Sequence, residues 1–203
     1  ILDNPKMNQF VSGHRLYQRK NGYISFSAKR KRGESKAKLT AVKYKIDPEH
    51  TFADFCQWVE GKLNVKVSDK KTAEDKELGI YTKLPRPLLK RAVGFVRWLD
   101  YNNILPSFFI EGDAFYTSIF VANLGSVGMA PGFHHLYEWG NAPLFMMAGK
   151  IEDRPVVVDG ELTSRKTLHI RWSYDERIDD GLTANYGINS VKRVLEQPYL
   201  YFG

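Results

Sequence analysis

Alternating apolar and polar residues near the start of the chain predict a pair of strands. Residues 22–27 and 39–46 both follow the two-residue period of half-buried strands. The charged segment between them, which includes the basic run 29–38, is expected to form the tip of a hairpin. Three aromatic residues follow the strand spacing and are expected in the core: Tyr23, Phe26 and Tyr44.

Two amphipathic helices are expected next. Thr51 can cap a helix whose apolar positions recur every three or four residues as far as Leu63. Pro85 opens a second, basic helix that ends near Asn102. Residues 67–82 between them are charged and aperiodic, which indicates a surface connection.

The second half of the chain reads as strands followed by one helix. Strands are predicted over residues 114–124, 143–150, 154–158 and 167–174, and a helix over residues 182–195. Helices early, strands late and long connections are typical of a layered α/β domain.

Composition narrows the class of protein. With 203 residues and 43% hydrophobic content, the chain can bury a full core without disulfides, so we expect one domain, 1–203. The net charge of +7 favours acidic or phosphorylated partners. A single cysteine, Cys56, excludes a disulfide framework within the chain and a cysteine-rich metal site, and no metal is expected.

The apolar stretches are too short to span a membrane, and no signal-peptide pattern opens the chain. We therefore expect a cytoplasmic protein with no membrane partner. Because the chain begins at Ile1 and not at Met, we leave open what precedes it.

Three stretches carry a resemblance to a known superfamily. Residues 120–128 contain Ala-Asn-Leu-Gly and a second glycine, residues 141–151 begin Asn-Ala-Pro, and residues 173–181 contain Asp-Glu-Arg-Ile-Asp-Asp-Gly. Their order and spacing resemble those of the chloramphenicol acetyltransferases and of the catalytic core of dihydrolipoyl acyltransferases from 2-oxoacid dehydrogenase complexes.

The resemblance implies a chloramphenicol acetyltransferase-like α/β domain of layered sheet and helices. It also implies a trimer whose sites are completed between subunits. The similarity is loose before residue 63, and the strand and helix that open such domains have no obvious counterpart after Ile1.

Family members transfer an acyl group between a thioester and a thiol or hydroxyl. A histidine acts as general base, and a serine donates a hydrogen bond to the tetrahedral oxyanion. Residue by residue, the histidine position is Glu176 and the serine position is Ala122. The matching motif positions are retained: Asn123, Gly125, Asn141, Asp175, Arg177, Asp180 and Gly181.

Two functions follow from this altered motif. The first is a catalytically degenerate member that serves as a trimeric scaffold or binding module, within an acyltransferase assembly of other subunits. The second is an active acyltransferase using coenzyme A or a lipoyl thioester as co-substrate, with Glu176 or one of His134 and His135 as the base. The alternative for the two histidines is that one stacks or hydrogen-bonds locally and the other is solvated.

A third function, of another class, is nucleic-acid binding through residues 29–38. It predicts an affinity that falls steeply with salt. We do not favour nucleic acid as a partner, because the aromatic residues nearby are expected in the core. None of these three candidate functions requires a cofactor.

Overall fold

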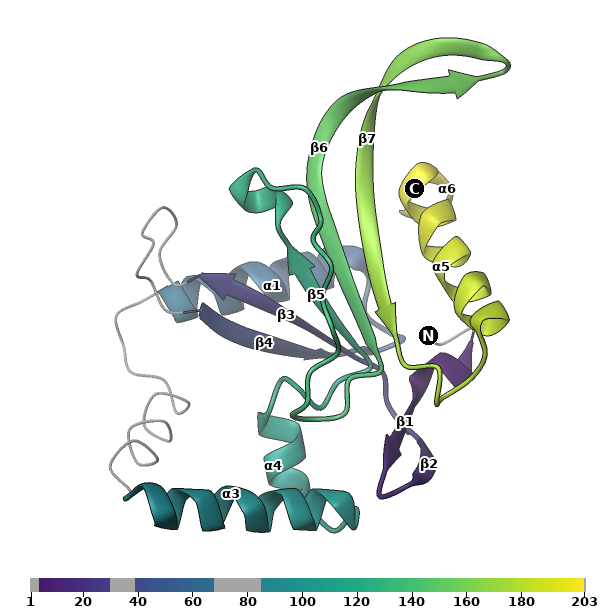
Figure 1. Cartoon of the computed structure of the whole chain (residues 1–203). Helices are drawn as coiled ribbons and strands as arrows, with labels where there is room; N and C mark the ends of the chain where they lie inside the picture. Colours follow the sequence, from purple (N-terminus) through teal and green to yellow (C-terminus); the bar gives the residue numbers. More distant parts are fainter. Residues whose placement is uncertain (1–3, 30–38, 68–84, 203) are drawn as a thin grey trace.

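A five-stranded mixed sheet forms the centre of the molecule (Figure 1). The computed structural model describes residues 4–29, 39–67 and 85–202. Along the sheet the strands follow the order β4 (Leu39–Lys45), β3 (Tyr23–Lys29), β5 (Ile119–Asn123), β6 (Leu144–Val158) and β7 (Glu161–Tyr174). The two central pairings, β3 with β5 and β5 with β6, are parallel, and the two outer pairings are antiparallel. The expected α/β class is confirmed.

The early hairpin is present, with Tyr23 opposite Lys45 and Phe26 opposite Val42. Of its aromatic residues, Tyr44 is buried, whereas Tyr23 and Phe26 are half-buried. The tip, residues 30–38, lies outside the described residues, and so does most of the connection expected over 67–82.

One face of the sheet packs against helices. Met7 in the short helix η1 (Pro5–Asn8) forms a buried cluster with Ile119 and Leu144. The glycine of α5 (Gly181–Glu196) at position 187 lies directly against Met7, so α5 and η1 pack together on this side. Helix α6 (Tyr199–Phe202) follows α5.

Helix α1 (Phe52–Val67) packs on β4, where Phe55 and Trp58 contact the ring of Tyr44. Its start is the expected cap. Thr51 Oγ1 accepts a hydrogen bond from the Asp54 amide, and Asp54 accepts one from the Thr51 amide.

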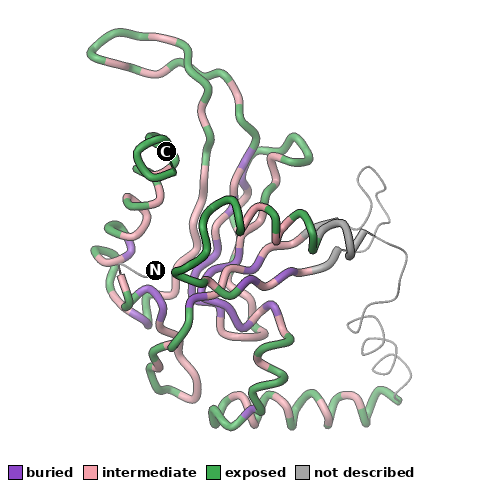
Figure 2. Tube along the Cα trace, turned by 180° about the vertical axis from the view of Figure 1, so that it is seen from behind, coloured by how far each residue is buried: buried purple, intermediate pink, exposed green. Residues whose placement is uncertain are grey.

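The other face is covered by irregular chain. Phe120 and Phe145 stack side by side on it, 5.5 Å between ring centroids, and Met147 completes the buried cluster. Phe115 and Tyr137, from the segments before and after β5, pack over them. Figure 2 shows the buried residues concentrated at this centre.

Two strand predictions need correction. The predicted strand 114–124 is regular only from Ile119. Before that point the backbone bends, because Thr117 Oγ1 and the Ser118 amide both donate to the Tyr23 carbonyl instead of forming a strand ladder. The predicted strands 143–150 and 154–158 are one strand, β6, with a register shift between Ala148 and Ile151.

Beyond that shift, β6 and β7 leave the body as a long arm (Figure 1). No residue from 150 to 169 is buried. Four large apolar side chains on the arm are exposed: Ile151, Val157, Leu162 and Leu168.

The second predicted helix is α3 (Arg86–Tyr101), followed by a short helix, α4 (Ser107–Gly112). A small separate hairpin, β1 (Gln9–Ser12) and β2 (Arg15–Gln18), packs on the end of α3, where Ser12 Oγ donates to the Asp100 carbonyl at 2.6 Å. Neither this hairpin nor α4 was predicted. None of the described helices combines the length and apolarity that crossing a membrane needs.

Candidate functional site

The serine position of the motif, Ala122, lies near the end of β5 and pairs with Met147 of β6. Its methyl group packs into the aromatic cluster of Phe120 and Phe145 and offers no hydrogen-bond donor. The turn after it is tight, since a Cβ on Gly125 would lie 2.3 Å from the Gly149 carbonyl oxygen. The Ser126 hydroxyl donates to the Asn123 carbonyl at 2.8 Å, so it is used within the turn.

Asn141 holds the half-buried arginine Arg19. The Nη2 atom of Arg19 donates to the Asn141 backbone oxygen at 2.6 Å and to its side-chain oxygen at 2.7 Å. The guanidinium also lies 4.4 Å from the centroid of the Phe10 ring. Burial lowers the pKa of Arg19 to about 10. Asn141 therefore ties the β1–β2 hairpin to the turn before β6.

The third motif forms a braced loop between β7 and α5. The amide of Asp175 donates to the Pro143 carbonyl, and its carboxylate accepts two hydrogen bonds from the Arg177 guanidinium, at 2.8 and 2.7 Å. Burial alone would raise the pKa of Asp175, but the hydrogen bonds from Arg177 outweigh it and hold that pKa below its usual value.

Asp180 begins α5. Its Oδ1 accepts the Thr183 amide at 3.0 Å, which is an N-cap hydrogen bond. The carboxylates of Asp175 and Asp180 thus make hydrogen bonds that hold the local backbone in place. Gly181 is different, because a Cβ there would meet nothing within 4 Å, and packing within the chain does not explain the glycine.

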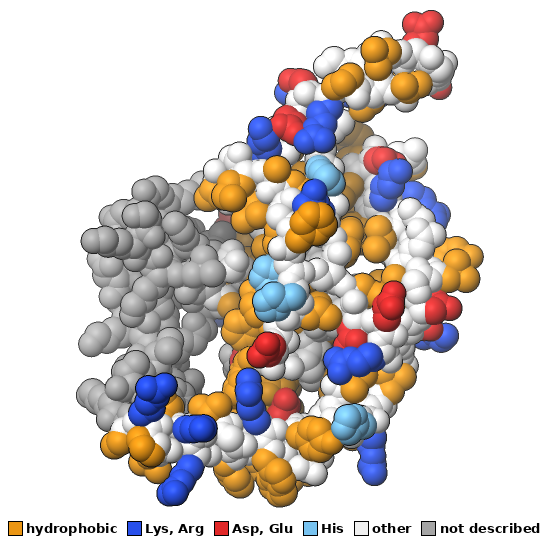
Figure 3. Space-filling view, viewed as in Figure 1, with side chains coloured by type: hydrophobic (Ala, Val, Ile, Leu, Met, Phe, Trp, Pro, Cys, Tyr) orange, Lys and Arg blue, Asp and Glu red, His pale blue; other side chains and the backbone are white. Residues whose placement is uncertain are grey.

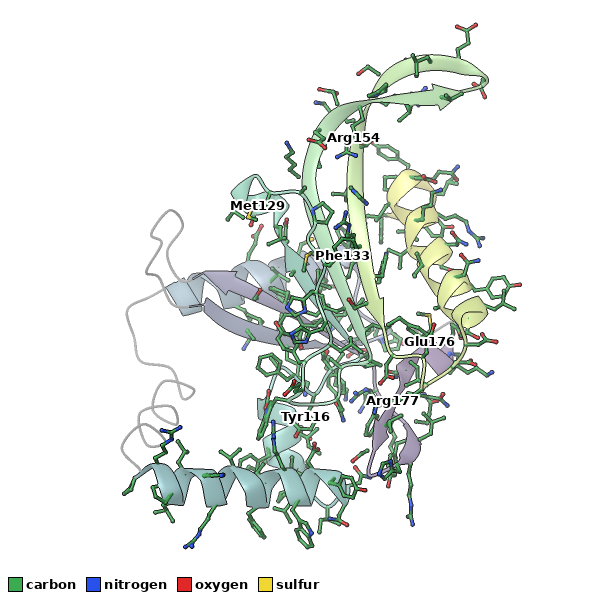
Figure 4. All side chains as sticks on the ribbon, viewed as in Figure 1. Tyr116, Met129, Phe133, Arg154, Glu176 and Arg177 are labelled. Carbon is green, nitrogen blue, oxygen red and sulfur yellow. The ribbon has the colours of Figure 1, made fainter. Side chains whose placement is uncertain are left out.

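Glu176, at the histidine position, is exposed. Within the described part of the chain its carboxylate makes no hydrogen bond or ion pair. Figure 4 shows it at the lower end of β7, beside Arg177.

Glu176 and Ala122 lie apart along the direction of the strands. The residue before Glu176 bonds to Pro143, whereas Ala122 pairs with Met147, four residues further along β6. At about 3.3 Å per strand residue, Pro143 and Met147 are about 13 Å apart along the strand. One chain alone does not bring the two positions together.

The two adjacent histidines differ in environment. The His134 ring stacks on Phe145, 4.0 Å between centroids, and the His134 carbonyl accepts the Ser173 hydroxyl. His135 is exposed, and its Nδ1 lies 2.6 Å from the Leu136 carbonyl, to which it donates. The two rings also stack on each other with centroids 5.3 Å apart, and the Nδ1 atom of His134 donates to the His135 carbonyl. Both histidines are therefore held locally, and which of them, if either, acts as a base stays a prediction.

His134 shares a sheet face with Ala122, because both pack on the segment from Phe145 to Met147. Next to it, Phe133 is 90% exposed and carries the Arg171 guanidinium 3.9 Å above its ring. Figure 4 places Phe133 well above Glu176 along β7. Of the candidate bases, His134 therefore lies closer to the face that holds the oxyanion position.

A cleft of about 420 Å³ opens beside Arg177. The β1–β2 turn, the end of α3 and the segment before Asn141 form its walls. It is lined by Val11, Ser12, Gly13, His14, Arg97, Asp100, Tyr101, Glu138, Asn141 and Arg177.

The cleft combines charges of both signs. His14, Arg97 and Arg177 supply positive or protonatable groups, and Asp100 and Glu138 supply carboxyl groups. Burial raises the pKa of Asp100, although a hydrogen bond with Tyr116 opposes the shift. Such a lining suits a polar ligand carrying both charges, and it holds no cysteine or activated serine.

Sequence reasoning missed His14. Its backbone φ of 62° follows the positive φ of Gly13, and the ring contacts Tyr101 edge-on at 5.7 Å. The one local signal was the glycine before it, which marks a turn. Within the described residues, no group of three or more His, Cys, Asp and Glu side chains is arranged to hold a metal ion.

Comparisons with known proteins agree with the motifs. Residues 113–202, which include all three motif stretches, match the family model of the 2-oxoacid dehydrogenases acyltransferase (catalytic domain). The predicted resemblance is confirmed over this part of the chain.

Among curated proteins, the chain is similar to the lipoamide acyltransferase component of the branched-chain alpha-keto acid dehydrogenase complex of Pseudomonas putida. The two are 38% identical over 64 residues, which are 30% of this chain and 15% of that protein. The chain thus matches only a small part of this relative's length.

The fold agrees over nearly the whole chain with solved structures. A probable dihydrolipoamide acetyltransferase from Listeria monocytogenes superposes with a TM-score of 0.58 at 17% identity, covering 97% of this chain and 64% of that one. The cubic core of the pyruvate dehydrogenase multienzyme complex superposes with a TM-score of 0.51 at 15% identity, covering 95% of this chain and 62% of that one. The acyltransferase-core fold predicted from the motifs is confirmed.

Proposed function

Since residues 113–202 match an acyltransferase catalytic domain, we propose that this chain is a catalytically degenerate core subunit of an acyltransferase-type assembly, acting as a trimeric scaffold or binding module. One observation carries the proposal. The motif side chains that brace the backbone, Asp175, Arg177 and Asp180, are retained and engaged, whereas Ala122 and Glu176 offer neither donor nor histidine base.

The magnitudes favour loss of catalysis. A positioned general base contributes roughly 10² to 10⁴-fold and one oxyanion donor roughly 10² to 10³-fold, so a site lacking both retains little rate. An ionised Glu176 would also repel the developing oxyanion.

The trimer is part of the proposal. The separation of Ala122 from Glu176 within one chain supports a site that is completed by a neighbouring subunit. The named relatives belong to multienzyme complexes, which supports assembly with other subunits. That residues 1–203 form one domain stays a prediction.

A second function is favoured by the position of His134 on the Ala122 face. Here the protein is an active acyltransferase, with coenzyme A or a lipoyl thioester as co-substrate. His134 takes the acceptor proton. Glu176 and His135 remain the other candidates for the base.

The first test is the mass in solution by light scattering, with a thiol-release assay using acetyl-CoA and dihydrolipoamide on the same sample. A trimer, or a multiple of three, without turnover above background supports the scaffold. A trimer with turnover supports the enzyme, and a monomer contradicts the trimer.

If turnover is found, three glutamine variants identify the base. His134→Gln, His135→Gln or Glu176→Gln should then lower the rate by about 10² to 10⁴-fold. His169→Gln is the matched control, because His169 is exposed on β7 and lies outside the three motif stretches. Rates equal to that of the control for all three variants would exclude all three residues as the base.

A further inference from the structure

Helix α3 receives little support from the rest of the described chain. None of its residues is buried (Figure 2). The β1–β2 hairpin contacts its C-terminal end, where the Ser12 hydroxyl donates to the Asp100 carbonyl and the His14 ring meets Tyr101. Figure 1 shows the helix standing apart from the sheet along its length.

The outward face of α3 is apolar and aromatic. Leu88, Phe95 and Trp98 are 51%, 60% and 55% exposed. Residues 88, 91, 95 and 98 are spaced by three, four and three, so they share one face of the helix, and Arg91 lies on it among the three apolar side chains. Phe95 and Trp98 stack on each other with ring centroids 6.1 Å apart, which forms one aromatic surface.

The charged side chains of this helix before Asp100 are all positive. Arg86, Lys90 and Arg91 are exposed, and residues 86–99 contain no acidic residue. Asp100, which ends the run, is half-buried and faces the cleft. In Figure 3, basic and hydrophobic side chains alternate along the helix at the bottom of the view.

We propose that α3 binds an anionic lipid surface, lying in the plane of the interface. Cations beside an exposed face rich in Trp, Phe and Leu, on a helix of low net hydrophobicity, characterise helices that lie on membranes. Long basic side chains on the apolar face and beside it keep their charges among the head groups while their stems lie along the acyl chains. Because residues 86–99 contain no acidic side chain, the charge of the helix is complementary to that of anionic head groups.

The helix does not span the membrane. Its 16 residues reach about 24 Å at 1.5 Å per residue, short of the roughly 30 Å hydrocarbon core. The expectation of no membrane partner considered only spanning segments, so a surface-bound helix departs from it. The cytoplasmic location stays a prediction and fits this proposal, because the cytoplasmic leaflet carries the anionic lipids.

The segment after α3 also exposes apolar side chains. Ile104 is 55% exposed and Phe108, in α4, is 69% exposed. Both belong to the stretch that links α3 to the sheet. A helix tethered at one end can rest on a flat surface without unfolding the rest of the domain.

The test is co-sedimentation of the full chain with vesicles of phosphatidylcholine alone and of phosphatidylcholine containing phosphatidylserine. We expect binding to the anionic vesicles only, with loss of binding at high salt. The variant Lys90→Glu with Arg91→Glu should weaken binding by about fivefold or more for each charge removed.

The apolar contribution is tested separately. Phe95→Ser with Trp98→Ser should reduce binding at least tenfold, while circular dichroism stays unchanged, since both side chains are exposed. Tyr199→Ser with Leu200→Ser is the matched control, because these side chains are 86% and 75% exposed in α6.

Two outcomes overturn the proposal. The first is no binding to anionic vesicles, and the second is equal binding by the Phe95 and Trp98 double variant. If that variant also has a lower mass in solution, the face is assigned to a contact between copies of the chain.

Discussion

The backbone of Gly13 lies so close to the carbonyl oxygen of Tyr101 that a side chain would not fit between them. A Cβ at this position would lie 2.1 Å from that oxygen, and the backbone φ is +53°. The residue thus sets how closely the β1–β2 turn approaches the end of α3, and with it one wall of the cleft.

We predict that Gly13→Ala lowers the free energy of unfolding by about 2 to 3 kcal/mol, through the left-handed backbone and the contact together. Urea denaturation measures the loss. Gly160→Ala is the control, because Gly160 has a φ of +86° and open space around it, and should cost only about 1 kcal/mol. Equal losses would mean that the turn moves away freely.

Asp175 and Arg177 form the second residue-scale feature. The Asp175 side chain is 11% exposed and that of Arg177 is 69% exposed. Asp175→Asn removes charge-assisted hydrogen bonds, and solvent screening at Arg177 holds the expected loss to about 1 to 2 kcal/mol at pH 7.

The pH dependence follows from the lowered pKa of Asp175. A carboxyl group whose folded pKa lies below its unfolded value of about 3.9 stabilises the fold above that pH, and its contribution is lost as pH falls through the folded pKa. The difference between wild type and Asp175→Asn should therefore be complete at pH 7 and shrink below about pH 4. Asp153→Asn, which removes an exposed pair with Lys166, should show no such difference.

At the scale of elements, α5 depends on its first residue. Asp180→Ala removes the hydrogen bond to the Thr183 amide and should destabilise the protein by about 1 kcal/mol, whereas Asp180→Asn should cost less, since asparagine also caps helices well. Thermal unfolding of the two variants compares them. An asparagine variant as unstable as the alanine variant would assign Asp180 a role that needs its charge.

The long helices and the hairpin were predictable because their signals are local. Thr51 stands three residues before Asp54, and Pro85 stands directly before a period of three and four. The β1–β2 hairpin has strands of only four residues each, and α4 has six residues, too few for a period to show.

The predicted strand before Ile119 failed for a different reason. Apolar residues there are buried, as a strand pattern suggests, but Thr117 and Ser118 bond to the Tyr23 carbonyl, a partner nearly a hundred residues away. The cleft was invisible for the same reason, since His14, Asp100 and Arg177 come from three distant segments. The motif residues were recognised through family resemblance, and their hydrogen bonds needed the structure.

At the scale of the whole molecule, the β6–β7 arm exposes apolar side chains that the described body does not cover. Val157 and Leu162 are opposite each other in register, 69% and 77% exposed. Exposed apolar patches of this kind mark contact surfaces.

We predict that Val157→Ser with Leu162→Ser lowers the mass measured by light scattering and leaves the unfolding midpoint nearly unchanged. Leu16→Ser, at an exposed leucine of β2, is the matched control and should leave the mass as it is. An unchanged mass for the arm variant would place the subunit contacts elsewhere.

The sheet also sets an order of events during synthesis. β3 pairs on its inner side with β5, and Ile24 lies opposite Ile119. When the ribosome has released the β3–β4 hairpin and α1, the neighbour of β3 does not yet exist, and that strand edge stays open until the chain has grown well past its midpoint. Closing such a distant parallel pair is slow. The nascent chain therefore has its greatest exposure to misassociation before β5 emerges, and a fragment that stops before residue 119 has no central strand around which to fold.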